Sequence, residues 1–129
     1  MPIAIDITAR PFPGRGSASV VRFTGELDSP AVEAARRALE ALVTAPPRTV
    51  VLDLEGLRFV DSRGIGVLLW VRKEVQRRGG TVLMTNIQPP IRKVFGILQA
   101  LPGMQIFETR SELDAYLKAE QEQAEEGDS

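Results

Sequence analysis

The chain of 129 residues contains no cysteine and no histidine. The absence of cysteine excludes disulfide bonds, thiolate metal ligands and thiol nucleophiles. The absence of histidine removes the commonest general base and the commonest metal ligand, and it excludes a Ser-His-Asp triad. The carboxylates are scattered without the spacing of metal ligands. We therefore expect no enzyme activity, no bound metal and no cofactor.

Charge and hydropathy exclude two further classes of function. The 16 Lys and Arg residues nearly balance the 17 Asp and Glu residues, so the chain lacks the basic excess that nucleic-acid phosphates require. No uncharged apolar stretch approaches the length of a membrane span, and the N-terminus lacks the pattern of a secretory signal. We expect a single cytoplasmic domain that binds no nucleic acid and does not insert directly into a membrane.

The spacing of apolar residues, prolines and glycines predicts about five strands and four helices. The strands are expected at residues 3–8, 18–24, 49–54, 81–86 and 104–107. The helices are expected to begin near Ser29, Ser62, Pro89 and Ser111. Because strands and helices alternate after a first hairpin, the predicted fold class is α/β, with a mixed sheet flanked by the four helices.

The predicted domain spans residues 1–118, and the acidic, polar segment 119–129 is expected to be a frayed or disordered tail. Within the domain, residues 10–17 are expected to form a loop and residues 25–28 a turn. The alternation of Ile3, Ile5 and Ile7 predicts that the first strand buries one face.

Several single residues carry expectations about packing. Ser29 is expected to cap the first helix. The apolar run 49–54 is typical of a central strand covered on both faces, and we interpret Asp53 within it as a satisfied structural group. Gly64 and Gly66 are expected to let the second helix approach its neighbours closely. Trp70 is expected to belong to the core more than to a partner surface.

A short polar group, Asp61 and Ser62, separates the third strand from the long apolar second helix. Either residue suits the helix N-cap, which is the usual role of such residues at this position. The alternative is that Ser62 is a regulatory phosphoacceptor, with its hydroxyl near the first free backbone N–H groups of the helix. The local pattern alone leaves both roles open.

Residues 52–69 (LDLEGLRFVDSRGIGVLL) resemble the signature of STAS domains, the anti-sigma factor antagonists of bacteria. Three further segments agree at the expected spacing: residues 23–28 (FTGELD), 78–82 (RGGTV) and 90–95 (PIRKVF). The resemblance implies a sheet flanked by helices, in agreement with the predicted element order. It implies that an anti-sigma factor with serine kinase activity phosphorylates Ser62, that the unphosphorylated chain binds this partner and frees a sigma factor, and that a serine phosphatase resets the switch.

The resemblance also implies a partner-binding surface made of Asp28, Asp61, Ser62, Arg63 and Gly64. Many family members have a second serine or threonine where this chain has Arg63. A guanidinium there can pair with the phosphate or with a carboxylate of the partner. A phosphate adds about −1.5 to −2 charges, which a helix N-terminus tolerates but an interface does not. We therefore predict an interface switch without large refolding.

Two other hypotheses compete with the phosphorylation switch. In the first, the chain is a non-phosphorylated docking or scaffold module of a stress-signalling or membrane-transport complex, and Ser62 is only a cap. In the second, the same surface senses a small ligand, although the sequence supplies no aromatic or charged pocket for one.

Overall fold

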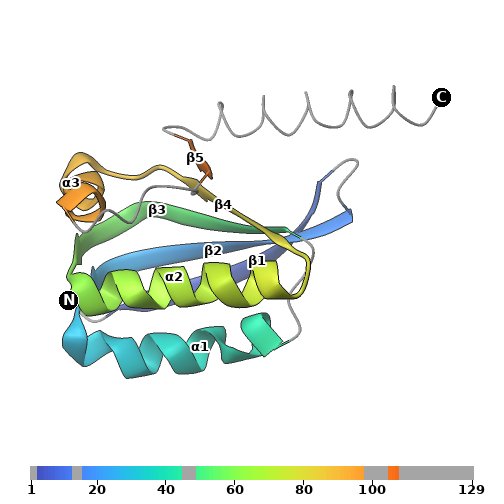
Figure 1. The fold of residues 1–129 in the computed structure, drawn as a ribbon, viewed down its shortest axis with the longest axis horizontal. Helices are drawn as coiled ribbons and strands as arrows, with labels where there is room; N and C mark the ends of the chain where they lie inside the picture. Colours follow the sequence, from blue (N-terminus) through green and yellow to red (C-terminus); the bar gives the residue numbers. More distant parts are fainter. Residues whose placement is uncertain (1–2, 13–15, 45–48, 98–104, 108–129) are drawn as a thin grey trace.

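The computed structural model describes residues 3–12, 16–44, 49–97 and 105–107, which form one sheet and the helices that pack on it (Figure 1). The strands are β1 (Ala4–Phe12), β2 (Gly16–Leu27), β3 (Thr49–Val60), β4 (Thr81–Thr85) and β5 (Gln105–Phe107). The helices are η1 (Ser29–Ala31, a 3-10 helix), α1 (Val32–Thr44), α2 (Ser62–Arg77) and α3 (Pro89–Ile97). This arrangement confirms the predicted α/β class. The helix expected after Ser111 and the expected tail lie outside the described residues.

The sheet follows the order of the chain, β1-β2-β3-β4-β5. The hairpin strands β1 and β2 are antiparallel, and every later neighbour is parallel. Figure 1 shows α1 and α2 side by side beneath one face of the sheet, while α3 lies near the carboxyl ends of β3 and β4, at the end of the molecule where α2 begins. The predicted mixed sheet and its crossover helices are therefore confirmed.

The core lies mainly between the sheet and the helices α1 and α2. Its members alternate along the strands and recur at helical spacing, as burial of one face requires. The largest fully buried side chains of the core are Phe23, Leu27, Leu39, Leu52, Leu54, Leu57, Ile65, Leu68, Met84, Ile91 and Phe95. Trp70 is partly buried against this core, and the Arg36 guanidinium lies 4.8 Å from the centroid of its ring.

The central strand β3 is covered on both faces over its first half, as predicted. All six residues from Thr49 to Leu54 are buried. The Asp53 carboxylate accepts hydrogen bonds from the Glu55 N–H and the Asn86 side-chain amide, both at 3.1 Å, and its other oxygen lies 3.4 Å from Nε of Arg22. These partners confirm the structural interpretation of Asp53.

The first strand is longer than predicted. Antiparallel pairing runs from Ala4 opposite Thr24 to Phe12 opposite Gly16, so part of the expected loop belongs to the strands. Pro11 is compatible with β1 because β1 is an edge strand. The missing proline N–H there does not interrupt hydrogen bonding between central strands. Ile7 is 40% exposed, so the predicted buried face does not extend along the whole strand.

The predicted turn at residues 25–28 is wrong, and so is the predicted end of β3 at residue 54. Parallel pairing continues from Gly25 opposite Leu57 to Leu27 opposite Val60. Two register shifts, one between Arg22 and Thr24 and one between Gly25 and Glu26, each leave one extra residue in β3. Gly25 has φ 104°, a conformation that favours glycine, so it accommodates an irregular strand where a turn was expected.

The two glycines at the start of α2 have different surroundings. A Cβ on Gly64 would lie 1.9 Å from the Leu27 carbonyl oxygen and 2.8 Å from Cγ2 of Val60. A Cβ on Gly66 would meet no atom within 4 Å. The expectation of close approach is therefore confirmed for Gly64 and wrong for Gly66.

We expect Gly64→Ala to lower the free energy of unfolding by about 3 kcal/mol or more, because the new methyl group overlaps the backbone of β2. Gly66→Ala is the matched control. It should leave stability unchanged or raise it by up to about 1 kcal/mol, because alanine favours an exposed helical position. Urea unfolding followed by circular dichroism measures both values. Equal stabilities of the two variants would contradict the packing described at Gly64.

Candidate functional site

The parallel strands β2 and β3 bring two helix starts together at one end of the molecule. Leu27 and Val60, the last residues of the two strands, are paired, and Asp28 and Asp61 follow them. Asp28 precedes η1 and Asp61 precedes α2. We call Asp28, Ser29, Asp61, Ser62 and Arg63 the helix-start surface.

Asp61 holds both helix starts with a single carboxylate. One oxygen accepts a hydrogen bond from the Gly64 N–H at 2.8 Å, which is the N-cap interaction of α2. The other oxygen accepts from the Ser29 N–H at 2.8 Å and from the Ser29 hydroxyl at 3.2 Å. The Asp61 N–H in turn donates to the Leu27 carbonyl oxygen at 3.4 Å.

The predicted cap at Ser29 is therefore wrong. Ser29 is the first residue of η1, and Asp28 is the residue in the N-cap position. Asp28 makes no side-chain cap hydrogen bond there. The Ser29 N–H donates instead to the Asp61 carboxylate, 32 residues later in the sequence.

The hydrogen bonds also set the protonation state of Asp61. Burial acts to raise the pKa of the Asp61 carboxyl, but the N–H groups of Gly64 and Ser29 and the Ser29 hydroxyl outweigh it. The pKa of Asp61 is consequently lower than its ordinary value. Asp61 therefore carries a full negative charge at neutral pH.

Ser62 is left without a capping role. Of the two candidates at this junction, Asp61 is the N-cap and Ser62 is the first residue of the 16-residue helix α2. The Ser62 side chain is exposed, and its hydroxyl has no hydrogen bond to another described residue. An exposed hydroxyl at a helix N-terminus lies where the helix dipole stabilises a phosphate.

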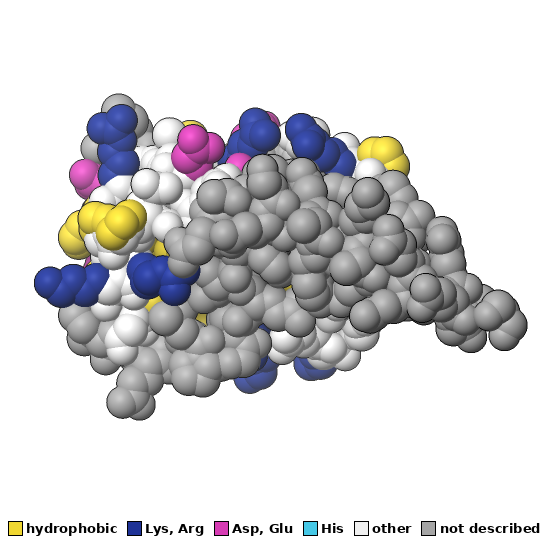
Figure 2. Space-filling model, turned by 90° about the horizontal axis from the view of Figure 1, so that it is seen from above, with side chains coloured by type: hydrophobic (Ala, Val, Ile, Leu, Met, Phe, Trp, Pro, Cys, Tyr) yellow, Lys and Arg dark blue, Asp and Glu magenta, His cyan; other side chains and the backbone are white. Residues whose placement is uncertain are grey.

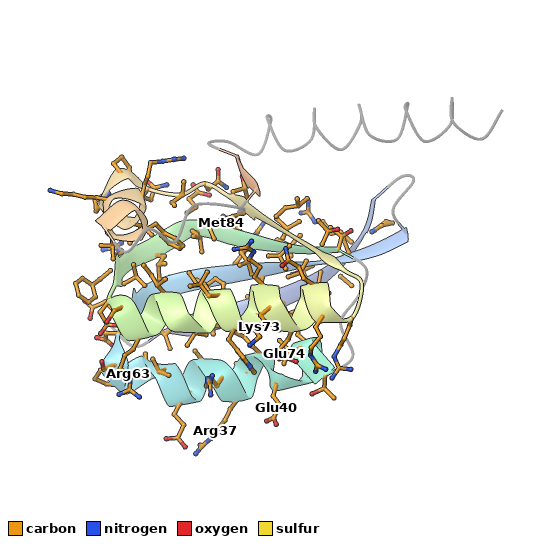
Figure 3. The ribbon with its side chains drawn as sticks, in the orientation of Figure 1. Arg37, Glu40, Arg63, Lys73, Glu74 and Met84 are labelled. Carbon is orange, nitrogen blue, oxygen red and sulfur yellow. The ribbon has the colours of Figure 1, made fainter. Side chains whose placement is uncertain are left out.

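The other predicted site residues divide between the surface and the interior. Arg63 is exposed, and Figure 3 shows its side chain at the end of the molecule that carries the start of α2. Asp28 is half-buried beside η1. Gly64 is buried beneath the helix-start surface, where it packs on β2. The structure thus brings Asp28, Asp61, Ser62 and Arg63 together and gives Gly64 a packing role.

Phe59 is an exposed residue at this end of the molecule that was not among the predicted site residues. Its side chain is 49% exposed although it belongs to a strand of the central sheet. Arg58 beside it is also exposed, while Leu57 and Val60 are buried. The signal in the sequence is the adjacent apolar pair Phe59 and Val60, which breaks the alternation of a strand and is typical of a bulge.

Other kinds of site are not found in the described part of the chain. Residues 3–12, 16–44, 49–97 and 105–107 hold no cluster of three or more acidic side chains arranged to bind a metal ion. No helix within these ranges is both long enough and apolar enough to cross a membrane. A hollow lies beside Arg22, Phe23, Thr24, Asp53 and Gly56, but its Asp53 carboxylate is already paired.

Comparison with known proteins identifies the family of this site. The model of the STAS domain matches residues 10–113. An anti-sigma F factor antagonist from Lysinibacillus sphaericus is 39% identical over 77 residues, which cover 59% of this chain and 66% of that relative. The chain thus spans slightly less than two thirds of this relative's length. A sodium-independent sulfate anion transporter from Bos taurus is 36% identical over 111 residues, 81% of this chain but 18% of the transporter.

Solved structures agree with the sequence comparison. The unphosphorylated form of the anti-sigma factor antagonist SpoIIAA superposes with a TM-score of 0.63 at 27% identity, covering 84% of this chain and 92% of that one. The phosphorylated form of the Bacillus protein SpoIIAA superposes with a TM-score of 0.60 at 29% identity, covering 80% and 90%. This fold is therefore known in a protein that exists with and without a phosphate.

We expect Asp61→Ala to lower the free energy of unfolding by about 1–2 kcal/mol at pH 7, because two helix starts lose an acceptor. The folded-state pKa of Asp61 lies below its unfolded value of about 3.9. The stabilisation is therefore complete above that value and disappears as the pH falls through the folded-state pKa.

Urea unfolding of wild type and Asp61→Ala at pH 7, 5 and 3 measures this effect as the difference between the two proteins. The difference should narrow at pH 3. Asp28→Ala is the matched control, since Asp28 makes no cap hydrogen bond and its removal should change stability by less than about 0.5 kcal/mol. A difference for Asp61→Ala that does not change with pH would contradict the role given to its charge.

Proposed function

This chain belongs to the STAS domain family, and we propose that it is an anti-sigma factor antagonist switched by phosphorylation at Ser62. In this proposal the unphosphorylated chain binds an anti-sigma factor with serine kinase activity in the cytoplasm, and a sigma factor is released. Transfer of a phosphate from ATP to Ser62 ends the binding, and a serine phosphatase restores it. The relative from Lysinibacillus sphaericus and SpoIIAA, both described as anti-sigma factor antagonists, support this role.

The observation that carries the proposal is that Asp61 caps α2, while the Ser62 hydroxyl makes no cap hydrogen bond. Both oxygens of Asp61 are occupied by N–H and hydroxyl donors, so the cap of α2 does not need the Ser62 hydroxyl. Ser62 is therefore free to be exposed, where a kinase can reach it. Modification of Ser62 removes no hydrogen bond from the described structure.

A phosphate on Ser62 is compatible with the fold. The dipole of α2 favours an anion at the start of the helix by roughly 0.3–1 kcal/mol. The neighbouring Arg63 side chain is exposed and can turn toward the phosphate. SpoIIAA, whose fold this chain shares, has been solved in both states.

The same phosphate opposes docking of a partner. Its charge of about −1.5 to −2 would have to be desolvated at an interface that already contains the negative charge of Asp61. A penalty of about 3 kcal/mol weakens binding roughly a hundredfold. The switch therefore acts on the interface, while the core between the sheet and α1 and α2 stays unchanged.

A second candidate function is a constitutive docking module. It is favoured by the match to the sulfate anion transporter, in which the similar region is only 18% of the protein. In that role the helix-start surface would bind a fixed partner, and Ser62 would be unmodified. Phosphorylation of Ser62 separates the two candidates.

We expect the chain to gain one phosphate when it is incubated with ATP and its cognate anti-sigma factor kinase, because the Ser62 hydroxyl is exposed. Ser62→Ala should gain none. Ser29→Ala is the matched control, since Ser29 is an exposed serine at the neighbouring helix start and should not affect the count of phosphates. Intact-mass spectrometry measures the number of phosphates. An unmodified wild type, with a kinase that is active on another substrate, would favour the docking module.

We further expect phosphorylated wild type to bind the kinase at least about a hundredfold more weakly than the unphosphorylated chain, without a change in helix content. Isothermal titration calorimetry measures the affinity, and far-ultraviolet circular dichroism measures the helix content. Loss of helical signal on phosphorylation would show that the switch refolds the domain and would refute an interface mechanism.

A further inference from the structure

We propose that Phe59 is the apolar anchor by which the unphosphorylated chain docks on its anti-sigma factor, and that the anchor enters a pocket with an acidic rim. This inference rests on the proposed function and names the chemistry of the partner surface. It concerns the residues that precede the helix-start surface in β3, to which the phosphorylation switch assigns no role.

A β-bulge turns Phe59 away from the core. Gly25 pairs with Leu57 and Glu26 pairs with Phe59, so Arg58 is an extra residue in β3. Leu57 is buried, and regular alternation would bury Phe59 as well. The extra residue shifts the alternation by one, so that Val60 is buried and Phe59 is exposed. A bulge next to a functional site commonly re-aims a side chain in this way.

The exposure of Phe59 is unusual within the described structure. Phe59 and Ile7 are the exposed large hydrophobic residues of that part of the chain, at 49% and 40%. An aromatic side chain combines a large contact area with few rotatable bonds, which is why aromatic residues are enriched among binding hot spots.

The position of Phe59 makes it continuous with the proposed kinase-facing surface. Phe59 is separated from Ser62 by Val60 and Asp61, and the pairing of Leu27 with Val60 fixes this segment beside the start of η1. A partner that brings its catalytic centre to the Ser62 hydroxyl therefore covers the neighbourhood of Phe59 as well. This continuity identifies the occupant as the same anti-sigma factor kinase.

The charges around Phe59 indicate an acidic rim on the partner. Arg58 and Arg63 are exposed, and neither side chain forms an ion pair with a described residue. Lys93 is exposed on α3, which packs against β3. At the left of Figure 2, the end that carries the starts of α2 and α3, hydrophobic side chains lie among several Lys and Arg side chains, with an acidic side chain at the edge of the group. Partner carboxylates would complement these cations.

The carboxylates near Phe59 do not cancel this argument. Glu26, which pairs with Phe59 across the strands, is half-buried and already has an interaction partner. Asp61 is occupied by Ser29 and Gly64, so its oxygens are turned toward the helix starts. Asp28 is half-buried beside η1. An acidic rim on the partner also explains why the switch is effective, because a phosphate on Ser62 would face carboxylates in place of a neutral hydroxyl.

The expected size of the effect follows from the exposed area. Burying the exposed half of an aromatic side chain removes about 100 Å² of apolar surface from water. This area corresponds to a gain in affinity of roughly 50-fold. We expect Phe59→Ala to weaken binding to the purified kinase by about 30-fold or more, within the range of an interface hot spot. Phe59→Leu should recover part of the loss.

The experiment compares wild type, Phe59→Ala and the matched control Ile7→Ala by isothermal titration calorimetry with the kinase that phosphorylates Ser62. Ile7→Ala should bind within about twofold of wild type, since Ile7 lies on the edge strand β1. In steady-state phosphorylation of Ser62, Phe59→Ala should raise KM with little change in kcat. Thermal unfolding of each variant verifies that the fold is retained.

The proposed acidic rim of the kinase is tested separately with the substitutions Arg58→Glu and Arg63→Glu in this chain. Each substitution should slow association with the kinase and reduce its dependence on salt concentration. Unchanged or faster association would overturn the acidic rim.

The remaining outcomes distinguish failure of the anchor from failure of the proposed function. If wild type binds no anti-sigma factor kinase, the proposed function fails. If wild type binds and Phe59→Ala binds equally well, the anchor is refuted while the switch stands. If wild type is a dimer by sedimentation velocity and Phe59→Ala is a monomer of unchanged kinase affinity, Phe59 serves contact between two copies, which also overturns the proposal.

Discussion

The carboxylate of Asp61 is the interaction on which the functional end of the molecule depends. It accepts hydrogen bonds from Gly64 on α2 and from Ser29 on η1, and so fixes the starts of two helices that follow neighbouring strands. Because donors surround it, the charge of Asp61 is retained at neutral pH. This arrangement makes the adjacent Ser62 unnecessary for capping and leaves its hydroxyl at the surface.

The buried and the exposed residues in the first turn of α2 therefore have different roles. Gly64 lies against the Leu27 backbone and lets α2 approach β2 more closely than any larger residue would. Ser62 and Arg63 face solvent on the same turn. The groups that hold the helix are thus distinct from those that are proposed to meet a partner, which is why a change of charge on the exterior need not disturb the core.

The sequence predicted those features that depend on neighbouring residues. The hairpin, the buried run 49–54 and the start of α2 all follow from local spacing. The extensions of β2 and β3 could not be predicted, because pairing across the strands maintains them over an irregular register. The partner of Ser29 is 32 residues distant, and the difference between Gly64 and Gly66 depends on Leu27, so neither can be derived from local pattern.

The bulge in β3 also bears on how related signalling pathways stay separate. The exposed pair Arg58 and Phe59 arises from one extra residue, while the flanking Leu57 and Val60 retain their places in the core. The identities of the exposed pair can therefore diverge with little effect on folding. Under the proposed docking role of Phe59, a bacterium that duplicates such a domain re-specifies its partner by substitutions at two positions, and so limits cross-talk between copies that share one fold and one proposed acceptor serine.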